Sequence, residues 1–253
     1  MTHREILIAY AIHYKGDWPK MLEALQKAEE PSKEDLAKAQ SCPFKAVTLL
    51  DSEYPVRLKN TSQPPLVLFY RGNLDLLANS EKSITIAGTR NPSSYGKEMT
   101  EQLVSDLIKA GYTIVTSMAL GVSSTAIETT LKQNGKVIVV LGCGIDICYP
   151  HSKQHLFDKL TENQLVISEF PAGVDPTMES MASKNRITTG IGEALLITEE
   201  KSPTTAEFFA LSQGKEIFCV PDRADQGSEC NKLIANGAVL TEKIEDILEV
   251  LKH

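Results

Sequence analysis

Short apolar runs alternate with longer amphipathic stretches from about residue 82 onward. The apolar runs have the length of strands and cover residues 83–87, 113–116, 137–141, 165–167, 194–198 and 217–220. The amphipathic stretches have helical spacing and cover residues 97–109, 123–133, 153–162, 204–213 and 229–235. Strands that are apolar on both faces and separated by helices indicate a parallel sheet that helices cover on each side. The pattern therefore predicts an α/β protein with a doubly wound, mostly parallel sheet.

The N-terminal part of the chain has a different pattern. Residues 1 to about 40 carry apolar positions at helical spacing, among them Ile6 and Ile12, with a break at Gly16. We therefore expect a small helical appendage over residues 1–44, followed by one main domain over residues 45–253.

Two further segments flank the alternating pattern. Residues 45–50 and 66–70 are apolar and extended, so we expect a lead-in that docks on the main domain. Residues 234–251 carry more apolar positions than a terminal helix needs to cover one face, namely Ile234, Val239, Leu240, Ile244, Ile247, Leu248 and Leu251. This excess predicts a homodimer surface, and packing of the segment on its own sheet is the alternative.

Small and polar residues follow four of the predicted strands, at residues 88–90, 117–121, 142–144 and 168–169. Doubly wound sheets bind ligands at the carboxyl ends of their strands. Glycine there lets a phosphate or a sugar approach the backbone, and the following helix contributes N–H groups and the positive end of its dipole. The alternative is that each glycine only forms a turn.

Composition and charge limit the possible functions. The 253 residues carry a net charge of -7, so a nucleic-acid site requires a local basic patch. The charged start and the absence of a long apolar run indicate a cytoplasmic protein that does not enter a membrane. The five cysteines contain no C-x-x-C pair and are expected to be reduced thiols. His151 and His155 have helical spacing but no further ligands in a cluster, so we expect neither a metal nor a cofactor.

Common catalytic signatures are absent. Each Gly-Lys pair lacks the Ser or Thr of a P-loop, and Ile147 stands where the dinucleotide fingerprint requires its third glycine. The chain also lacks a G-x-S-x-G nucleophile elbow. The sequence therefore gives no reason to expect an enzyme.

Six ordered motifs carry a resemblance to a known family. They lie at residues 54–72, 88–96, 142–150, 168–171, 184–187 and 231–238. The second reads Gly-Thr-Arg-Asn-Pro-Ser-Ser-Tyr-Gly, similar to G-S-R-x-x-S-x-Y-G, and the third resembles G-x-G-x-D-x-x-Y-P. In this order they resemble the DNA-processing protein A (DprA/Smf) family over about residues 45–240.

The resemblance implies a fold, a function and a site. Members of this family have an extended Rossmann-like domain, form dimers, bind single-stranded DNA and help load the recombinase RecA during natural transformation. The residues that it implies for phosphate binding are Gly88, Thr89, Arg90, Ser117, Gly121, Gly142, Gly144, His151, Lys184, Asn185 and Arg186. Arginine suits this role because its planar fork of donors matches phosphate oxygens. For Arg186 the alternative is an ion pair with Glu169 or Glu199.

The departures from the family motifs leave other functions open. The stretch after the second strand loses a Gly, an Asp and a His, so Met118, Ser123 and Ile127 are unusual, and Asp222 replaces a glycine. One alternative is a nucleotide-binding or nucleotide-processing protein similar to the Lonely Guy phosphoribohydrolases, although neither of their glycine-rich loops is present. Another is an interaction protein that has lost DNA binding.

Overall fold

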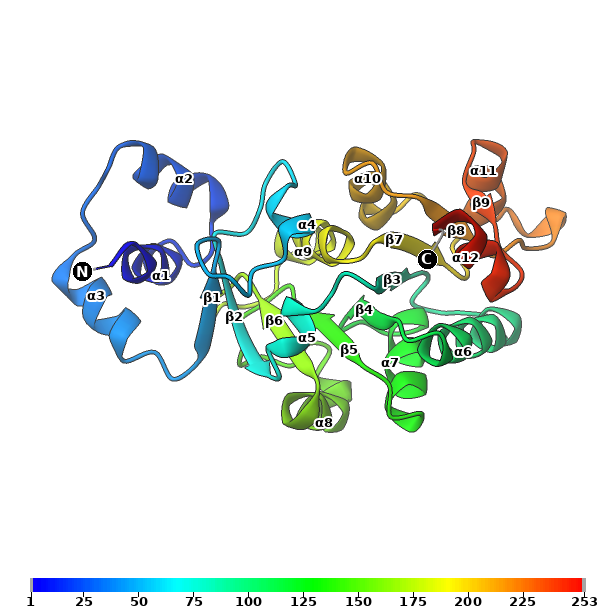
Figure 1. Ribbon diagram of the computed structural model, residues 1–253, viewed down its shortest axis with the longest axis horizontal. Coiled ribbons are helices and arrows are strands. Elements are labelled where there is room, and N and C mark those ends of the chain that lie inside the picture. The colour runs from blue at the N-terminus through cyan, green and yellow to red at the C-terminus, as the bar shows by residue number, and fades with distance from the viewer. Residues whose placement is uncertain (1, 252–253) are drawn as a thin grey trace.

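The computed structural model describes residues 2–251, across which nine strands form one sheet in the order β1-β2-β6-β5-β4-β3-β7-β8-β9 (Figure 1). The strands are β1 (Lys45–Thr48), β2 (Val67–Gly72), β3 (Ser83–Ala87), β4 (Thr113–Ser117), β5 (Val137–Val140), β6 (Leu165–Ser168), β7 (Ala194–Ile197), β8 (Ile217–Cys219) and β9 (Val239–Leu240). The strands from β3 to β9 pair in parallel, whereas β2 pairs antiparallel with both β1 and β6. The predicted mostly parallel sheet is confirmed.

The order of the strands creates a switch point at β3. The chain runs from β3 through β4 and β5 to β6 and then returns to place β7 on the other side of β3. Its crossovers contain α6 (Ser94–Lys109), α7 (Val122–Lys132), α8 (Gln154–Asn163), α9 (Met178–Ile191), α10 (Thr205–Ser212) and α11 (Glu229–Ala235). The crossovers diverge on either side of β3, so a crevice opens at the carboxyl ends of the strands, where doubly wound sheets bind ligands.

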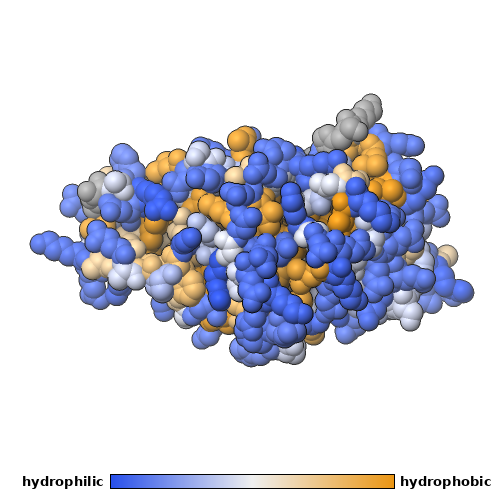
Figure 2. All heavy atoms as spheres, turned by 60° about the horizontal axis from the view of Figure 1, so that its bottom comes forward, coloured by the Kyte–Doolittle hydropathy of each residue, from blue (hydrophilic) through white to orange (hydrophobic). Residues whose placement is uncertain are grey.

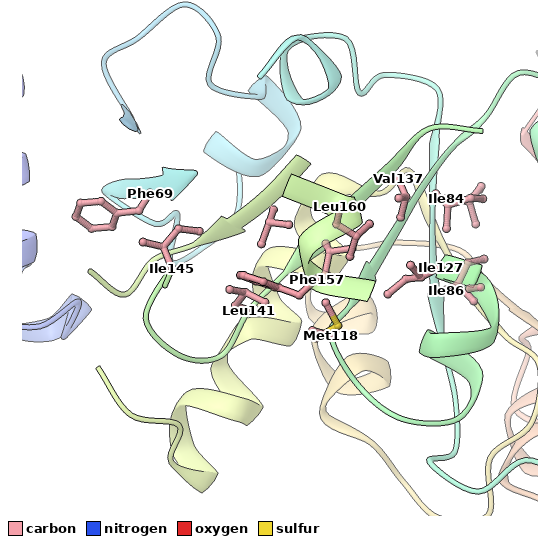
Figure 3. Close-up of a cluster of buried hydrophobic side chains, with 14 of the residues drawn as sticks. Phe69, Ile84, Ile86, Met118, Ile127, Val137, Leu141, Ile145, Phe157 and Leu160 are labelled. Atoms are coloured by element: carbon pink, nitrogen blue, oxygen red, sulfur yellow. The ribbon is translucent and has the colours of Figure 1, made fainter. Parts of the chain in front are cut away.

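Helices cover both faces of the sheet, which is why strands such as β5 and β7 are buried and apolar along their whole length. On β5, Val137 and Val139 pack in a core cluster with side chains of α6, α7 and α8. Ile138 and Val140 pack on the opposite face with α4 (Val56–Lys59), α5 (Asp75–Ala78) and α9. Figure 3 shows part of the first cluster, with Phe157 of α8 beside Leu141.

The predicted N-terminal helical appendage consists of α1 (His3–His13), α2 (Trp18–Gln26) and α3 (Lys33–Gln40), at one end of the molecule (Figure 1). Each helix begins at a side-chain cap, from Thr2, Asp17 and Ser32 respectively. Apolar side chains of the appendage, including Leu7 and Met21, belong to the same core cluster as the sheet. The appendage is therefore packed on the main body rather than tethered to it.

The lead-in and one helix show how the structure compares with the sequence-based expectation. The lead-in forms β1 and β2, and it docks on the rest of the domain by extending the sheet beyond β6. Helix α9 was not expected, because its buried side chains include the polar residues Ser180, Lys184, Arg186, Thr188 and Thr189. A helix whose buried side is polar gives no apolar period of 3.6 residues.

The C-terminal segment ends in α12 (Ile244–Leu251), whose Ile247 is fully buried in the main core cluster. Val239, Ile244, Leu248 and Leu251 pack partly buried against the same cluster. Most of the apolar positions that predicted a dimer surface are thus explained by packing within the chain.

The face of the protein shown in Figure 2 is mostly hydrophilic, with apolar side chains in scattered groups between the polar ones. Among residues 2–251, no helix combines the length and apolar character that crossing a bilayer requires.

Candidate nucleic-acid interface

A cleft of about 710 Å³ opens at the carboxyl ends of β3 and β4. Its walls come from the loops after these two strands, the first turns of α9 and α10, and the segment before α10. Small and polar side chains predominate in the lining, and six of the predicted site residues are among them, namely Gly88, Thr89, Arg90, Ser117, Lys184 and Asn185. The fold thus brings together residues that lie far apart in the sequence.

Arg90 and Lys184 are the two cations among the described residues that line this cleft. Arg90 is exposed, and within residues 2–251 its guanidinium has no ion-pair partner. Lys184 is only 5% exposed, and its Nζ donates to the carbonyl of Met181 at 2.9 Å. Burial, followed by the nearby positive charge of Arg90, lowers the pKa of Lys184 to about 8. Two converging cations that have no carboxylate partner within residues 2–251 form a site for an anion.

Helix α7 adds donors beside Arg90. Its N-cap, Gly121, has a φ of 73° and supplies no side-chain cap, so no cap occupies the N–H groups of Ser123 and Ser124 in the first turn of α7. A Cβ on Gly121 would lie 2.3 Å from the carbonyl oxygen of Thr89, and the N–H of Val122 donates to that same oxygen at 3.1 Å. Only glycine lets α7 start this close to the loop that holds Arg90.

The start of α10 forms another wall of the cleft. Thr204 caps this helix, and its Oγ1 accepts from the N–H of Glu207. Asn185 Nδ2 donates to Thr205 Oγ1 at 2.6 Å, which fixes α9 against α10. Glu200 also lines the cleft, and its carboxylate accepts from the backbone of Lys201. The field at this wall is therefore mixed, with one acid opposite the two cations.

The position of Arg186 corrects an expectation from the sequence. Its side chain is 5% exposed and forms an ion pair with Glu169 at 2.5 Å, with Glu169 equally buried. Ser183 Oγ donates to the other carboxylate oxygen at 3.1 Å. The alternative ion pair with Glu169 is thus confirmed, and the guanidinium is directed into the protein instead of toward the cleft.

Gly142 and Gly144 are also buried. The N–H of Gly144 donates to the carbonyl of Val174 at 2.7 Å, so it is not free for a phosphate. A Cβ on Gly142 would lie 2.9 Å from the Cα of Met181, because α9 crosses directly over this loop. Both glycines serve close packing between the loop and its neighbours, which corrects their expected role as a phosphate-binding backbone.

The remaining predicted residues lie at the edges of the cleft. Gly121 lines an adjoining hollow, and His151 is exposed next to Tyr149, with ring centroids 6.3 Å apart. Tyr149 itself is 40% exposed and lines the cleft, where its ring offers a stacking surface for a base. The sequence motif contained Tyr149, but only the fold shows that its ring lines the cleft.

Met118 is one of the departures from the family motif, and its position in the structure shows what this side chain does. Its side chain is 1% exposed and packs in the core among Leu141, Ile127 and Phe157 (Figure 3). The Met118 side chain therefore fills space in the core under the loop after β4 and does not reduce the space in the cleft. Ile127 is likewise fully buried in the same cluster, so the lost His position has become part of the core.

The described residues contain no group of three or more His, Cys, Asp or Glu side chains close enough to hold a metal ion. The fold and the cleft together define a doubly wound protein whose switch point carries a site lined by small and polar residues and by the cations Arg90 and Lys184. Such sheets bind phosphate-bearing ligands at this place.

Residues 45–252 match the family described as DNA recombination-mediator protein A, and the chain belongs to this family. It is 32% identical to the DNA processing protein DprA of Streptococcus pneumoniae over 211 residues, covering 81% of this chain and 73% of the relative. It is 33% identical to the protein Smf of Synechocystis over 195 residues, which are 74% of this chain and only 49% of that protein. The chain thus spans about half the length of the Synechocystis relative.

Two solved structures of family members have the same fold. The X-ray structure of DNA processing protein A from Streptococcus pneumoniae superposes with a TM-score of 0.82 at 26% identity, covering 95% of this chain and 97% of that one. A structure that addresses the single-stranded DNA binding mode of DNA processing protein A from Helicobacter pylori superposes with a TM-score of 0.74 at 26% identity, covering 83% and 96%.

Proposed function

We propose that this protein binds single-stranded DNA through its phosphodiester backbone and acts as a recombination mediator. The observation that carries the proposal is the convergence of Arg90 and Lys184, two cations without a carboxylate partner, on one cleft at the switch point. Family membership and the single-stranded DNA binding described for the Helicobacter pylori relative support it. Because backbone contacts carry no sequence information, binding should have little sequence preference.

The action proposed is binding rather than catalysis. Among the described residues that line the cleft there is no His or Cys, and Glu200 is the one carboxylate. Such a lining offers neither a nucleophile with an adjacent base nor a pair of acids for general acid and base roles. Loading of a RecA-type recombinase and assembly as a homodimer in the cytoplasm complete the proposal. Phe208 and Leu211, which are 64% and 61% exposed on α10, are apolar side chains on which a protein partner could pack.

The test is fluorescence anisotropy with a labelled single strand and the matching duplex across a salt series. Arg90→Ala should weaken binding of the single strand by about 1.5 to 3 kcal/mol, the range for a hydrogen bond to a charged group. It should also flatten the log-log salt slope by about 0.7, because one phosphate contact is lost. The matched control is Lys109→Ala, at the far end of α6. Lys252, which the sequence alone suggests as a control because it lies outside every motif, is outside the described residues.

Other outcomes decide between the remaining functions. If Arg90→Ala and Lys109→Ala bind equally well at every salt concentration, the cleft is not the binding site. If a mononucleotide competes as well as an oligonucleotide, the nucleotide-binding function replaces the DNA-binding one. Absence of saturable binding to any nucleic acid at low salt would leave an interaction protein.

A further inference from the structure

A second hollow of about 520 Å³ lies directly beside the main cleft, and Arg90 lines both. It is enclosed by the loop after β3, the first turn of α6, the first two turns of α7 and Lys153. We call it the α6–α7 hollow. The position of Arg90 makes the two spaces neighbours on one continuous surface.

The α6–α7 hollow has an excess of positive charge. Arg90, Lys97 and Lys153 line it together with one acid, Glu128. Lys97 is exposed and, within residues 2–251, belongs to no ion pair. The whole chain has a net charge of -7, so this excess of positive charge is local to the hollow and is not a property of the protein as a whole.

Backbone donors point to the same ligand. Gly121 leaves the first turn of α7 without a side-chain cap, and Gly121, Ser124 and Thr125 of this turn line the hollow. Ser124 Oγ already donates to the carbonyl of Ala119 at 2.6 Å, so its hydroxyl proton is occupied. The uncapped N–H groups and the three cations therefore suit an anionic group, and a phosphate in particular.

Glu128 and Lys153 close the far side of the hollow. Lys153 Nζ lies 3.0 Å from Glu128 Oε1, and the two side chains are 24% and 47% exposed. An ion pair this exposed contributes little to stability, so a phosphate can exchange with Glu128 as the partner of Lys153. The same two residues also line a further hollow, between α7 and α8, that includes Lys132 and Lys159.

We propose that the α6–α7 hollow is a second phosphate subsite, through which a nucleic-acid strand leaves the main cleft past Arg90 toward α8. This proposal rests on the proposed function, because it extends the path of the same strand. Lys97 and Lys153 hold the phosphate there, and Glu128 opposes it. The strand thus occupies successive hollows along the edge of the sheet, with Arg90 between the first two.

The experiment uses the full chain and labelled oligo(dT) of about 4 and about 16 nucleotides, within the range of known single-strand site sizes. For the longer strand, Lys97→Ala and Lys153→Ala should each weaken binding about three- to tenfold at low salt. Each should lower the salt slope by about 0.7. Glu128→Gln should strengthen binding, since it removes the opposing charge and frees Lys153. The shorter strand has fewer phosphates and reaches fewer of these hollows, so it should respond less to all three substitutions.

Lys109→Ala on the same helix as Lys97 is the matched control, and thermal melts check that every variant is folded. If Lys97→Ala, Lys153→Ala and Glu128→Gln bind the longer strand like the control while Arg90→Ala weakens it, the second subsite is wrong and the proposed function stands. If Arg90→Ala also behaves like the control, both proposals fail.

Discussion

At the scale of single residues, Lys184 combines a cost in stability with a gain in binding. Its ammonium group is buried beside Arg90, and both effects disfavour its charged form. We expect Lys184→Met to raise the free energy of unfolding by about 1 to 3 kcal/mol at neutral pH, the scale of a pKa shift of this size. The same substitution should weaken binding of single-stranded DNA. Urea unfolding and anisotropy on one preparation measure both, and Lys109→Met serves as the exposed control.

The pH dependence of Lys184 gives an independent measure of the same effect. The folded-state pKa of about 8 lies below the ordinary value of 10.5, so the unfolded chain binds more protons between these values. Stability should therefore rise as the pH increases from about 8 toward 10.5, and the contribution should be absent in Lys184→Met. DNA affinity should change in the opposite direction, falling above about pH 8 as the ammonium loses its proton. Equal pH profiles for the parent and Lys184→Met would contradict this prediction.

At the scale of elements, the start of α7 controls the loop that holds Arg90. Gly121→Ala would place a Cβ 2.3 Å from the Thr89 carbonyl oxygen and 2.5 Å from the carbonyl carbon of Arg90. Gly214 has a similar φ of +65°, but a Cβ there meets nothing within 4 Å, which makes Gly214→Ala the matched control. In both variants the free energy of unfolding should fall by about 1 kcal/mol or more, because alanine is strained at a positive φ. Only Gly121→Ala should also lose DNA affinity, and equal affinities would show that the loop tolerates the shift.

The elements also show how far local pattern determines structure. The expected strand at residues 137–141 is β5 (Val137–Val140), because a strand that is buried on both faces has a continuous apolar run in its sequence. Helix α9 carries no such run, because its buried side chains include polar ones such as that of Thr188. The backbone carbonyl of Thr188 accepts from Thr85 Oγ1 at 2.8 Å, which holds the helix against β3. Its Thr177 cap was a local signal that could have suggested a helix start.

At the scale of the whole molecule, the C-terminal edge of the sheet offers a surface for assembly. Of the seven C-terminal apolar positions that predicted a homodimer, Leu240 stays exposed, at 46%, on the edge strand β9. We expect a dimer that uses this edge, with Leu240→Asp shifting the protein to a monomer. Light scattering at micromolar concentration measures the mass, and Leu50→Asp, at an exposed site at the other end of the sheet, is the control. A single-chain mass for the parent protein would count against the dimer.

The sequence by itself determined the doubly wound sheet, the helical appendage and the position of Arg90 at the end of a strand. These features follow from contacts and spacings within a few residues, so the local pattern contains them. The ordered motifs likewise gave the family, because their spacing along the chain is a property of the sequence alone.

Only the tertiary structure decided which of the motif residues face the cleft. Lys184 and Arg186 stand two positions apart on α9, about 200° around the helix, so they point in different directions. Which of them reaches the cleft depends on Glu169, which pairs with Arg186 from a distant loop. Segments that are distant in the sequence also keep two glycines from the cleft. Gly142 packs against α9, and the N–H of Gly144 donates to the carbonyl of Val174. The rotation of a helix about its axis depends on contacts with residues that are distant in the sequence. The sequence contains these residues but does not show which of them come together in the fold.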